Sequence, residues 1–255
     1  MFINNFDPVA FQVLSIEIRW YSLAYIVGIL IGWILSKKLF ISDQSIKEKF
    51  DDFITYVIVG IIIGGRLGYV LFYNYSYYAD NLLAIFKIWQ GGMSFHGGLI
   101  GVVIASIWFS KKNNHDTFKY FDIISLVSPI GIFFGRISNF INSELYGRET
   151  DLLWSVKFVS VDNINRHPSQ IYEAIFEGLI LFIILNYLTS RINKKEGYVS
   201  SVFLIFYSIF RFVIEFTREP DAQIGLLYLN LSIGQIISIF VLFFGIYLWQ
   251  SKKNV

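Results

Sequence analysis

Cysteine is absent from this 255-residue chain, which also has only four prolines and three histidines. Without cysteine the chain can form neither disulfide bonds nor thiolate metal sites. The three histidines lie in three separate segments, a spacing that does not match a zinc site. We therefore expect no bound metal.

Charged residues are also scarce. They make up 16% of the chain, against roughly 25% in average soluble proteins, whereas 55% of the residues are hydrophobic. The net charge of +2 is too close to zero to indicate a nucleic acid as partner. This composition excludes disordered, collagen-like and disulfide-stapled chains, and it argues against an ordinary soluble domain.

Long apolar stretches dominate the sequence. A helix needs about 20 mainly apolar residues to cross a bilayer, and seven stretches approach or reach that length: 18–35, 53–72, 93–109, 121–141, 171–188, 199–216 and 231–249. We predict an all-α, polytopic membrane protein with about seven transmembrane helices and one integral membrane domain over residues 1–255. We predict that segments of about 74–92 and 142–168 form a small outer cap. We also predict that residues 9–18 form a short helix that lies on the membrane surface.

Lysine and arginine are distributed differently along the chain. If each predicted span crosses the membrane once, four of the segments between and after the spans lie on the same side. Eleven of the thirteen lysines lie in these four segments, whereas only one of the eight arginines does. The positive-inside rule makes this side cytoplasmic, with the N-terminus outside and the C-terminus inside. The other arginines lie outside or within spans, where the planar guanidinium suits bidentate recognition of phosphate or carboxylate.

Three arginines interrupt apolar runs: Arg66, Arg136 and Arg211. Each costs roughly 2.5–3.5 kcal/mol at the centre of a bilayer on insertion scales. Their spans run outward and each arginine lies past the middle, so all three are expected in the outer half of the membrane. We predict an anion pocket there, with a phospholipid headgroup as the anion.

Internal ion pairing is the alternative interpretation. Glu215 lies four residues after Arg211, and Arg218 three after Glu215, so this trio can neutralise itself along one helix face. Two further carboxylates lie on the fifth predicted span: Glu173 and Glu177. Both interpretations stay open for Arg211, whereas the other two arginines have no acidic residue within four positions.

His96 and a polar segment after Arg136 add further candidate groups. His96 opens the third span in GGMSFHGGLIG, and its imidazole can take up a proton near pH 7 or simply form an interfacial hydrogen bond. Asn139 and Glu144, in NFINSELYGRET, can bind a headgroup or orient Arg136. Helix capping and turn formation are the alternative roles for such residues.

Five motifs in order resemble those of the bacterial prolipoprotein diacylglyceryl transferase family: GGRLGYVLFYN, GGMSFHGGLIG, GRISNFINSELYGRET, RHPSQIYE and RFVIEFTREPDAQ. The resemblance covers nearly the whole chain, with Ser138 and Ser143 standing where the family usually or often has glycine. It implies transfer of the diacylglyceryl group from phosphatidylglycerol to the lipobox cysteine thiol of a prolipoprotein, with release of glycerol phosphate. No cofactor is implied.

The resemblance also implies a location and a set of site residues. The enzyme would be a multi-pass protein of the bacterial plasma (inner) membrane, with its active site toward the outer leaflet. Catalytic roles are implied for His96, Arg136 and Arg211. Phosphatidylglycerol-binding roles are implied for a larger set in matching motifs: Tyr21, Arg66, Arg136, Asn139, Glu144, Gly147, Glu215 and Arg218.

The reaction needs a thiolate, so either His96 acts as the base or the arginine field lowers the thiol pKa. A transporter of anionic lipid or of a small anion is the main rival, since it too would line a pocket with arginine. A protease is less consistent with the sequence, which has no HExxH or GxSxG motif. A non-catalytic lipid-binding scaffold would show binding without a covalent product.

Overall fold

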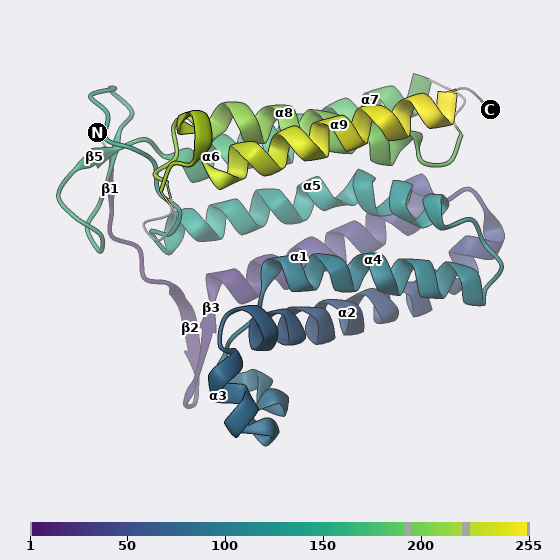
Figure 1. Ribbon diagram of the computed structural model, residues 1–255, viewed down its shortest axis with the longest axis horizontal. Helices are drawn as coiled ribbons and strands as arrows, with labels where there is room; N and C mark the ends of the chain where they lie inside the picture. Colours follow the sequence, from purple (N-terminus) through teal and green to yellow (C-terminus); the bar gives the residue numbers. More distant parts are fainter. Residues whose placement is uncertain (1, 192–194, 221–224, 254–255) are drawn as a thin grey trace. The chain divides into compact units, whose positions relative to one another are not determined.

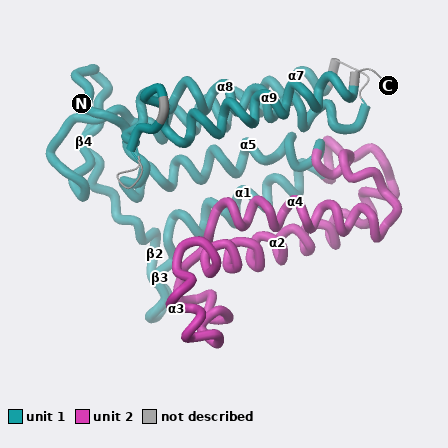
Figure 2. The backbone as a smooth tube through the Cα atoms, viewed as in Figure 1, with its two compact units in different colours: residues 1–36, 122–255 teal, residues 37–121 magenta. Residues whose placement is uncertain are grey.

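The computed structural model describes residues 2–191, 195–220 and 225–253 (Figure 1). Contacts divide the chain into two compact units, coloured separately in Figure 2. Unit 1 contains residues 1–36 and 122–255, and unit 2 contains residues 37–121. Lys194, one of the lysines behind the predicted orientation, lies outside the described residues. The single membrane domain stays a prediction.

A helix lies at each of the seven predicted spans. The first four are α1 (Trp20–Leu35), α2 (Gln44–Phe72), α4 (Phe95–Lys112) and α5 (Thr117–Ile141). The fifth is continuous through α6 (Ser169–Glu173), the π-helical η4 (Ala174–Ile180) and α7 (Leu181–Arg191), and the last two are α8 (Tyr198–Ile214) and α9 (Ile233–Lys253). Shorter helical segments are η1 (Ser36–Phe40), α3 (Tyr75–Asp80), η2 (Leu82–Phe86), η3 (Ile88–Gln90) and η5 (Tyr228–Asn230).

Among the described residues, five helical stretches are long and apolar enough to cross a membrane: Trp20–Phe40, Gln44–Phe72, Thr117–Ile141, Ser169–Thr189 and Ile233–Lys252. Helix α8 is apolar but has only 17 residues, and α4 carries His96 and two terminal lysines within its 18 residues. The protein is therefore a polytopic helical membrane protein. The count of seven spans and the orientation of the termini stay predictions.

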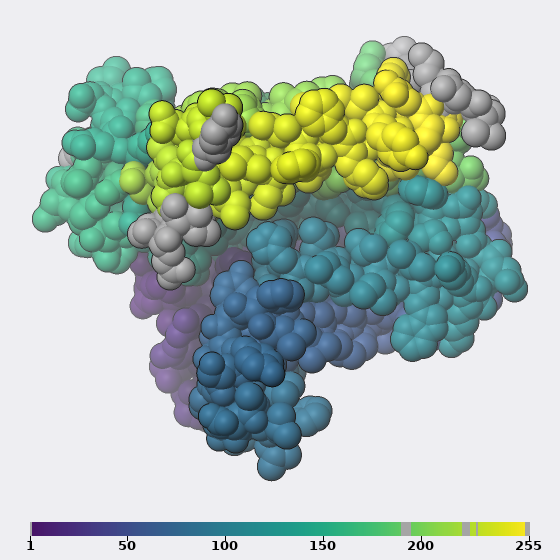
Figure 3. Space-filling view, in the orientation of Figure 1, coloured from purple at the N-terminus to yellow at the C-terminus, as the bar shows by residue number. Residues whose placement is uncertain are grey.

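Large apolar side chains cover the surface of α9. The helix forms a continuous ridge on the face shown in Figure 3, where it is yellow. Its exposed side chains include Phe240, Phe243, Phe244 and Tyr247. Soluble proteins rarely expose so much contiguous apolar surface, so this face fits contact with lipid.

The prediction of a surface-lying helix over residues 9–18 is wrong. Strands β2 (Val9–Val13) and β3 (Ile16–Arg19) form an antiparallel hairpin, with Leu14 at a φ of 55° in the turn. Apolar β-branched and aromatic residues alternate here with polar ones, a period-2 pattern that favours strands. Apolar content alone does not distinguish a helix from a strand in so short a run.

The prediction of an all-α fold also needs correction, because unit 1 contains a second, three-stranded sheet. Strand β4 (Val156–Phe158) lies between β1 (Phe2–Asn4), to which it is parallel, and β5 (Asn165–Arg166), to which it is antiparallel. Strands β4 and β5 belong to the segment predicted as part of the outer cap. The described part of the chain is thus mostly helical with two small sheets.

Glycines bring α2 and α4 together in unit 2. A side chain on Gly64 would overlap the carbonyl oxygen of Gly97, and one on Gly101 would overlap that of Gly60. Small residues at such positions let helix backbones approach closely in membranes. The close approach leaves an apolar groove of about 580 Å³ along the two helices.

In unit 1, Asp122 fixes the beginning of α8. Its carboxylate accepts hydrogen bonds from the backbone nitrogens of Gly197 (2.7 Å) and Ser200 (2.8 Å) and from the Ser200 hydroxyl (2.6 Å). These bonds satisfy amide groups that the first turn of a helix leaves without partners. Asp122 lies on α5, so these hydrogen bonds connect the two helices that carry Arg136 and Arg211.

Candidate functional site

The guanidiniums of Arg136 and Arg211 converge on the carboxylates of Glu173 and Glu177. Arg136, on α5, places Nε 3.2 Å from Oε2 of Glu173 and Nη2 3.4 Å from Oε2 of Glu177. Arg211, on α8, contacts Oε1 of Glu173 and lies 3.8 Å from Oε1 of Glu177. Three helical segments of unit 1 therefore meet at one ionic cluster.

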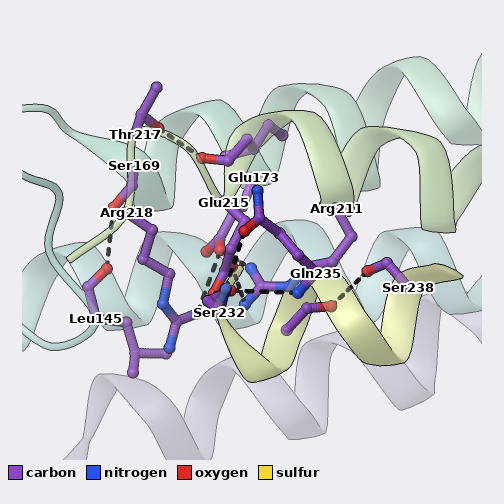
Figure 4. A network of polar contacts seen from close by, with 12 residues as sticks. Leu145, Ser169, Glu173, Arg211, Glu215, Thr217, Arg218, Ser232, Gln235 and Ser238 are labelled. Atoms are coloured by element: carbon purple, nitrogen blue, oxygen red, sulfur yellow. Dashed lines mark hydrogen bonds and ion pairs between the residues drawn. The ribbon is translucent and has the colours of Figure 1, made fainter. Parts of the chain in front are cut away.

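A second layer of ion pairs extends this cluster (Figure 4). Nη2 of Arg211 lies 2.5 Å from Oε2 of Glu215, and Nη1 of Arg218 lies 3.3 Å from Oε1 of Glu173. Together, three guanidiniums and three carboxylates form what we call the six-residue ionic cluster: Arg136, Glu173, Glu177, Arg211, Glu215 and Arg218. Its formal charges cancel, as three positive and three negative groups.

Helical spacing explains part of this arrangement. Glu173 and Glu177 are four residues apart at the change from α6 to η4, so they project from one face. Arg211 and Glu215 are also four apart, and α8 ends at Ile214. A π-helical turn within an α-helix is rare and frequently occurs at functional sites.

The beginning of α9 closes the cluster on the side of Glu215. The Ser232 hydroxyl donates to Oε1 of Glu215 at 2.9 Å, and a side chain on Gly234 would meet the same carboxylate. The positive end of a helix dipole stabilises a carboxylate in this position. Glu215 therefore links α8 to the N-terminus of α9.

Burial within the ionic cluster is uneven. The side chains of Glu173 and Glu177 are completely buried, whereas those of Arg136 and Arg211 retain 17% and 13% of their exposure. The carboxylates thus lie behind the guanidiniums, which present the accessible side of the cluster. Desolvated carboxylates without counter-ions would be costly, and removing one partner of such a buried pair typically costs about 3–5 kcal/mol.

Asn139, Glu144 and Gly147 follow Arg136 in the polar segment. Nδ2 of Asn139 donates to Oε2 of Glu144 at 3.1 Å, and the backbone nitrogen of Glu144 donates to the Asn139 carbonyl at 2.9 Å. Ser143 adopts a φ of 57°, in the left-handed region that glycine accepts without strain. The segment therefore turns sharply at the end of α5.

Gly147, in the cap, sits between two other backbone segments, at His167 and at Thr217–Arg218. Its nitrogen donates to the carbonyl of His167 at 3.0 Å, and it pairs as an antiparallel bridge with Arg218. A side chain on Gly147 would overlap the carbonyl of His167 and crowd that of Thr217. The glycine therefore positions the backbone that carries Arg218.

Arg166 organises the rest of the cap. Its Nη2 donates to Oδ2 of Asp162 at 2.7 Å, and its guanidinium packs over the ring of Tyr146. The hydrogen bond from Arg166 lowers the pKa of Asp162 below its ordinary value. Burial lowers the pKa of His167, because the charged imidazolium loses hydration there.

Tyr21 lies in the first turn of α1, in unit 1. Its hydroxyl is 3.2 Å from that of Tyr25, one turn further along, and the two rings meet edge to face. The hydrogen bonds and ion pairs described for Tyr21 do not join it to the six-residue ionic cluster. Its role in binding phosphatidylglycerol stays a prediction.

Arg66 belongs to unit 2 and is almost fully buried. Its guanidinium donates to five backbone carbonyls in one segment: Ala84, Ile85, Lys87, Gly91 and Gly92. It also packs against the ring of Tyr78 at 5.1 Å. The described contacts of Arg66 thus fold residues 78–92 around it, and its predicted role toward phosphatidylglycerol stays untested.

His96 also belongs to unit 2, as the second residue of α4. Ser94 caps this helix by accepting from the nitrogen of Gly97 at 3.2 Å. The His96 ring is exposed and meets Phe95 edge to face. Its catalytic role stays a prediction.

Two members of the ionic cluster, Glu173 and Glu177, were absent from the predicted site residues. The sequence indicates them only as alternative counter-ions for the arginines. A stronger signal was present, because two acidic residues four apart within an apolar span form one acidic face. Ionisable residues within membrane spans are rare and usually mark functional sites.

Comparison with known proteins identifies the family of this chain. The sequence model of the family described as prolipoprotein diacylglyceryl transferase matches residues 8–251. The phosphatidylglycerol–prolipoprotein diacylglyceryl transferase of Rickettsia bellii (strain OSU 85-389) is 51% identical over 248 residues, which cover 96% of this chain and 94% of the relative. The enzymes of the same name from Rickettsia felis and Rickettsia typhi are 50% and 49% identical, with coverage of 96% and 97% of both chains. This chain therefore belongs to the prolipoprotein diacylglyceryl transferase family, as a transferase of lipoprotein biosynthesis.

Proposed function

We propose that this chain transfers the diacylglyceryl group of phosphatidylglycerol to the lipobox cysteine thiol of prolipoproteins. Membership of the family and the names of the relatives support both substrates. Within the structure, one observation carries the proposal. Arg136 and Arg211, on two apolar helices, converge on fully buried carboxylates and stay partly accessible themselves.

Arg136 and Arg211 hold the phosphodiester of the lipid in this proposal. Each guanidinium has five N–H donors in a rigid fork, and the buried carboxylates engage only some of them. Phosphate oxygens accept from the remainder on the accessible side. Since Glu173 and Glu177 already fix both side chains, little conformational entropy is lost when the lipid binds.

The chemical step exchanges one bond for another. The cysteine sulfur attacks the carbon of the diacylglyceryl group that bears the phosphate. A C–S bond forms, and the bond between that carbon and the phosphate oxygen breaks. The electron pair of that bond leaves with glycerol phosphate. Arg136 and Arg211 stabilise the charge that grows on the leaving phosphate, and such fixed donors are typically worth about 2.7–4 kcal/mol each.

The thiol must lose its proton before or during the attack. His96 accepts it in our scheme, since an imidazole exchanges protons near neutral pH. If His96 is dispensable, the positive field of the arginines lowers the thiol pKa and water takes the proton. A comparison of pH–rate profiles separates the two schemes.

Further residues complete the proposed lipid site. Asn139 and Glu144 contact each other just after Arg136, and the backbone at Gly147 pairs with the backbone at Arg218. We assign these residues, together with Tyr21, Arg66, Glu215 and Arg218, to binding phosphatidylglycerol or to positioning the groups that do.

The proposed setting is the bacterial plasma membrane. Seven helices span the bilayer, the N-terminus lies outside and the C-terminus inside. The distribution of lysines supports this orientation, and it places the active site toward the outer leaflet. There both the lipid and the exported lipobox segment can reach it.

A transfer assay tests this function. Purified protein is reconstituted in vesicles of phosphatidylcholine with labelled phosphatidylglycerol and given a lipobox peptide. We expect the peptide to gain one diacylglyceryl group through its cysteine, with equimolar release of glycerol phosphate. A peptide that stays unmodified while labelled lipid or anion crosses the vesicle membrane would contradict the proposal and support a transporter.

A further inference from the structure

The β2–β3 hairpin has two chemically different faces. Its register pairs Phe11 with Ile18 and Val13 with Ile16, and Gln12 with Glu17. Because side chains alternate across a strand, the first two pairs lie on one face and the third pair on the other. We call these the apolar face (Phe11, Val13, Ile16, Ile18) and the polar face (Gln12, Glu17, Arg19) of the hairpin.

The apolar face has little protein cover. Phe11 and Val13 are each 51% exposed and Ile16 is 63% exposed, and Leu14 at the tip is 94% exposed. On the polar face, Arg19 and Glu17 form an exposed ion pair at 3.4 Å. A two-stranded hairpin is marginally stable in water unless its apolar face is packed. The hairpin therefore requires a partner for that face.

The chain itself indicates where that partner lies. Strand β3 ends at Arg19 and the membrane-spanning helix α1 begins at Trp20 without an intervening loop. Trp20, Tyr21 and Tyr25 follow with partly exposed rings, and Trp and Tyr are enriched at the level of lipid headgroups. The hairpin is thus attached at the point where the chain enters the bilayer.

Its backbone limits how deeply the hairpin can enter. Both strands have open edges, whose unpaired amide and carbonyl groups are costly in the hydrocarbon core, where no water can satisfy them. In the hydrated headgroup region they bind water. The alternation of apolar and polar faces fits this boundary, as it does for amphipathic helices that lie on membranes.

We propose that the β2–β3 hairpin lies on the membrane surface, with its apolar face against the lipid and its polar face toward water. The partner is the headgroup and upper acyl region of the bilayer rather than another protein. This contact continues the lipid-facing surface of α1 and holds the first helix of unit 1 at a fixed depth. It depends on α1 spanning the membrane and not on the transfer activity.

The absence of cysteine from the chain makes a direct test available. Single variants of the full chain carry a nitroxide label on the apolar face (Phe11→Cys, Val13→Cys, Ile16→Cys) or on the polar face (Gln12→Cys, Glu17→Cys). Leu30→Cys in α1 serves as the lipid-facing control, because its side chain is exposed within the span. Each is reconstituted in vesicles of phosphatidylcholine and phosphatidylglycerol, and collisions with oxygen and with a water-soluble nickel chelate are measured.

At the three apolar-face positions and at Leu30, we expect the label to collide rarely with the nickel chelate and often with oxygen. At both polar-face positions, we expect it to collide often with the nickel chelate and rarely with oxygen. Equal access of nickel to all five hairpin positions would overturn the proposal. Protection of the apolar face that appears only after a lipobox peptide is added would also overturn it, in favour of peptide docking. Water access at Leu30 would remove its premise. Unchanged transfer activity in these variants keeps the test separate from the proposed function.

Discussion

Arg136 and Arg211 lie on different helices, α5 and α8, and contact opposite oxygens of the same carboxylate, that of Glu173. Glu173 is completely buried, so it holds the two guanidiniums at a fixed separation from behind. A phosphate that binds both arginines therefore meets donors already in place. Fixed donors of this kind stabilise developing charge without reorganisation during the reaction.

Replacing Arg136 by lysine keeps the charge and removes the fork. A lysine cannot bind a carboxylate and a phosphate through parallel donors. We expect Arg136→Lys to lose about 10²- to 10³-fold in the rate of transfer, as for loss of one transition-state donor. The assay uses labelled phosphatidylglycerol and a lipobox peptide. Arg19→Lys, at an exposed ion pair outside the site, is the matched control and keeps its rate; a normal rate in Arg136→Lys would refute the assignment.

Glu173→Gln removes the shared counter-ion of three arginines. Removing one partner of a buried ion pair typically costs about 3–5 kcal/mol, so we expect a much lower unfolding temperature in detergent. Glu17→Gln breaks only an exposed pair and should change the stability by less than about 0.5 kcal/mol. Equal stability of the two variants would show that Glu173 does not support the cluster.

Packing of α2 against α4 predicts a contrast between two glycines. In Gly64→Ala, the added methyl overlaps the carbonyl oxygen of Gly97, whereas a methyl on Gly131 in α5 meets open space. Overpacking typically costs about 1–3 kcal/mol. We expect Gly64→Ala to lower the unfolding temperature and Gly131→Ala to leave it unchanged or slightly higher. The opposite order would contradict the described helix contact.

Arg66→Met tests whether this arginine folds the segment around it. Five backbone carbonyls lose their donor in the variant, and hydrogen bonds to charged groups contribute about 1.5–3 kcal/mol each. Amide hydrogen exchange of residues 78–92 should accelerate strongly, while exchange in unit 1 stays as in the wild type. Exchange that is unchanged in residues 78–92, with phosphatidylglycerol binding lost, would assign Arg66 to the lipid instead.

Acidification should weaken the cap. The pKa of His167 is lowered from 6.5 in the folded chain, so the unfolded chain binds more protons between the two values. The neutral His167 ring therefore contributes its full stabilisation of the folded chain above about pH 6.5, and this contribution is lost as the pH falls through this window. The lowered pKa of Asp162 acts in the same direction at lower pH, below its ordinary 3.8.

The measurement is the unfolding temperature in detergent at about pH 7.5 and about pH 5.5. His167→Gln should show a smaller decrease than the wild type across this interval. A decrease in His167→Gln as large as in the wild type would exclude His167 as its source.

Helices were the part of the fold that the sequence predicted best. Apolar composition over about 20 residues is a local property, and each predicted span contains a helix. Helix α2 begins nine residues earlier than predicted, at Gln44 rather than Phe53, because its first turns are rich in charged residues and do not continue the apolar run. The hairpin was mistaken for a helix because residues 9–18 are too short for their period to decide.

The sequence singled out the two arginines of the ionic cluster but not the carboxylate that they share, because that contact joins residues far apart in the chain. Arg136 and Arg211 stand out because charge is costly in apolar surroundings. That both share Glu173 depends on how three helices pack, and spacing along one helix cannot show it. The partners of Arg66 are backbone carbonyls, which every residue possesses, so the sequence carries no signal for them.

A structure with a non-cleavable phosphatidylglycerol analogue, in which a phosphonate replaces the scissile ester, tests the central claim most directly. We expect its phosphoryl oxygens within hydrogen-bond distance of both Arg136 and Arg211, with Glu173 still behind the two guanidiniums. A headgroup bound elsewhere, with both arginines engaged only by Glu173, Glu177 and Glu215, would contradict it.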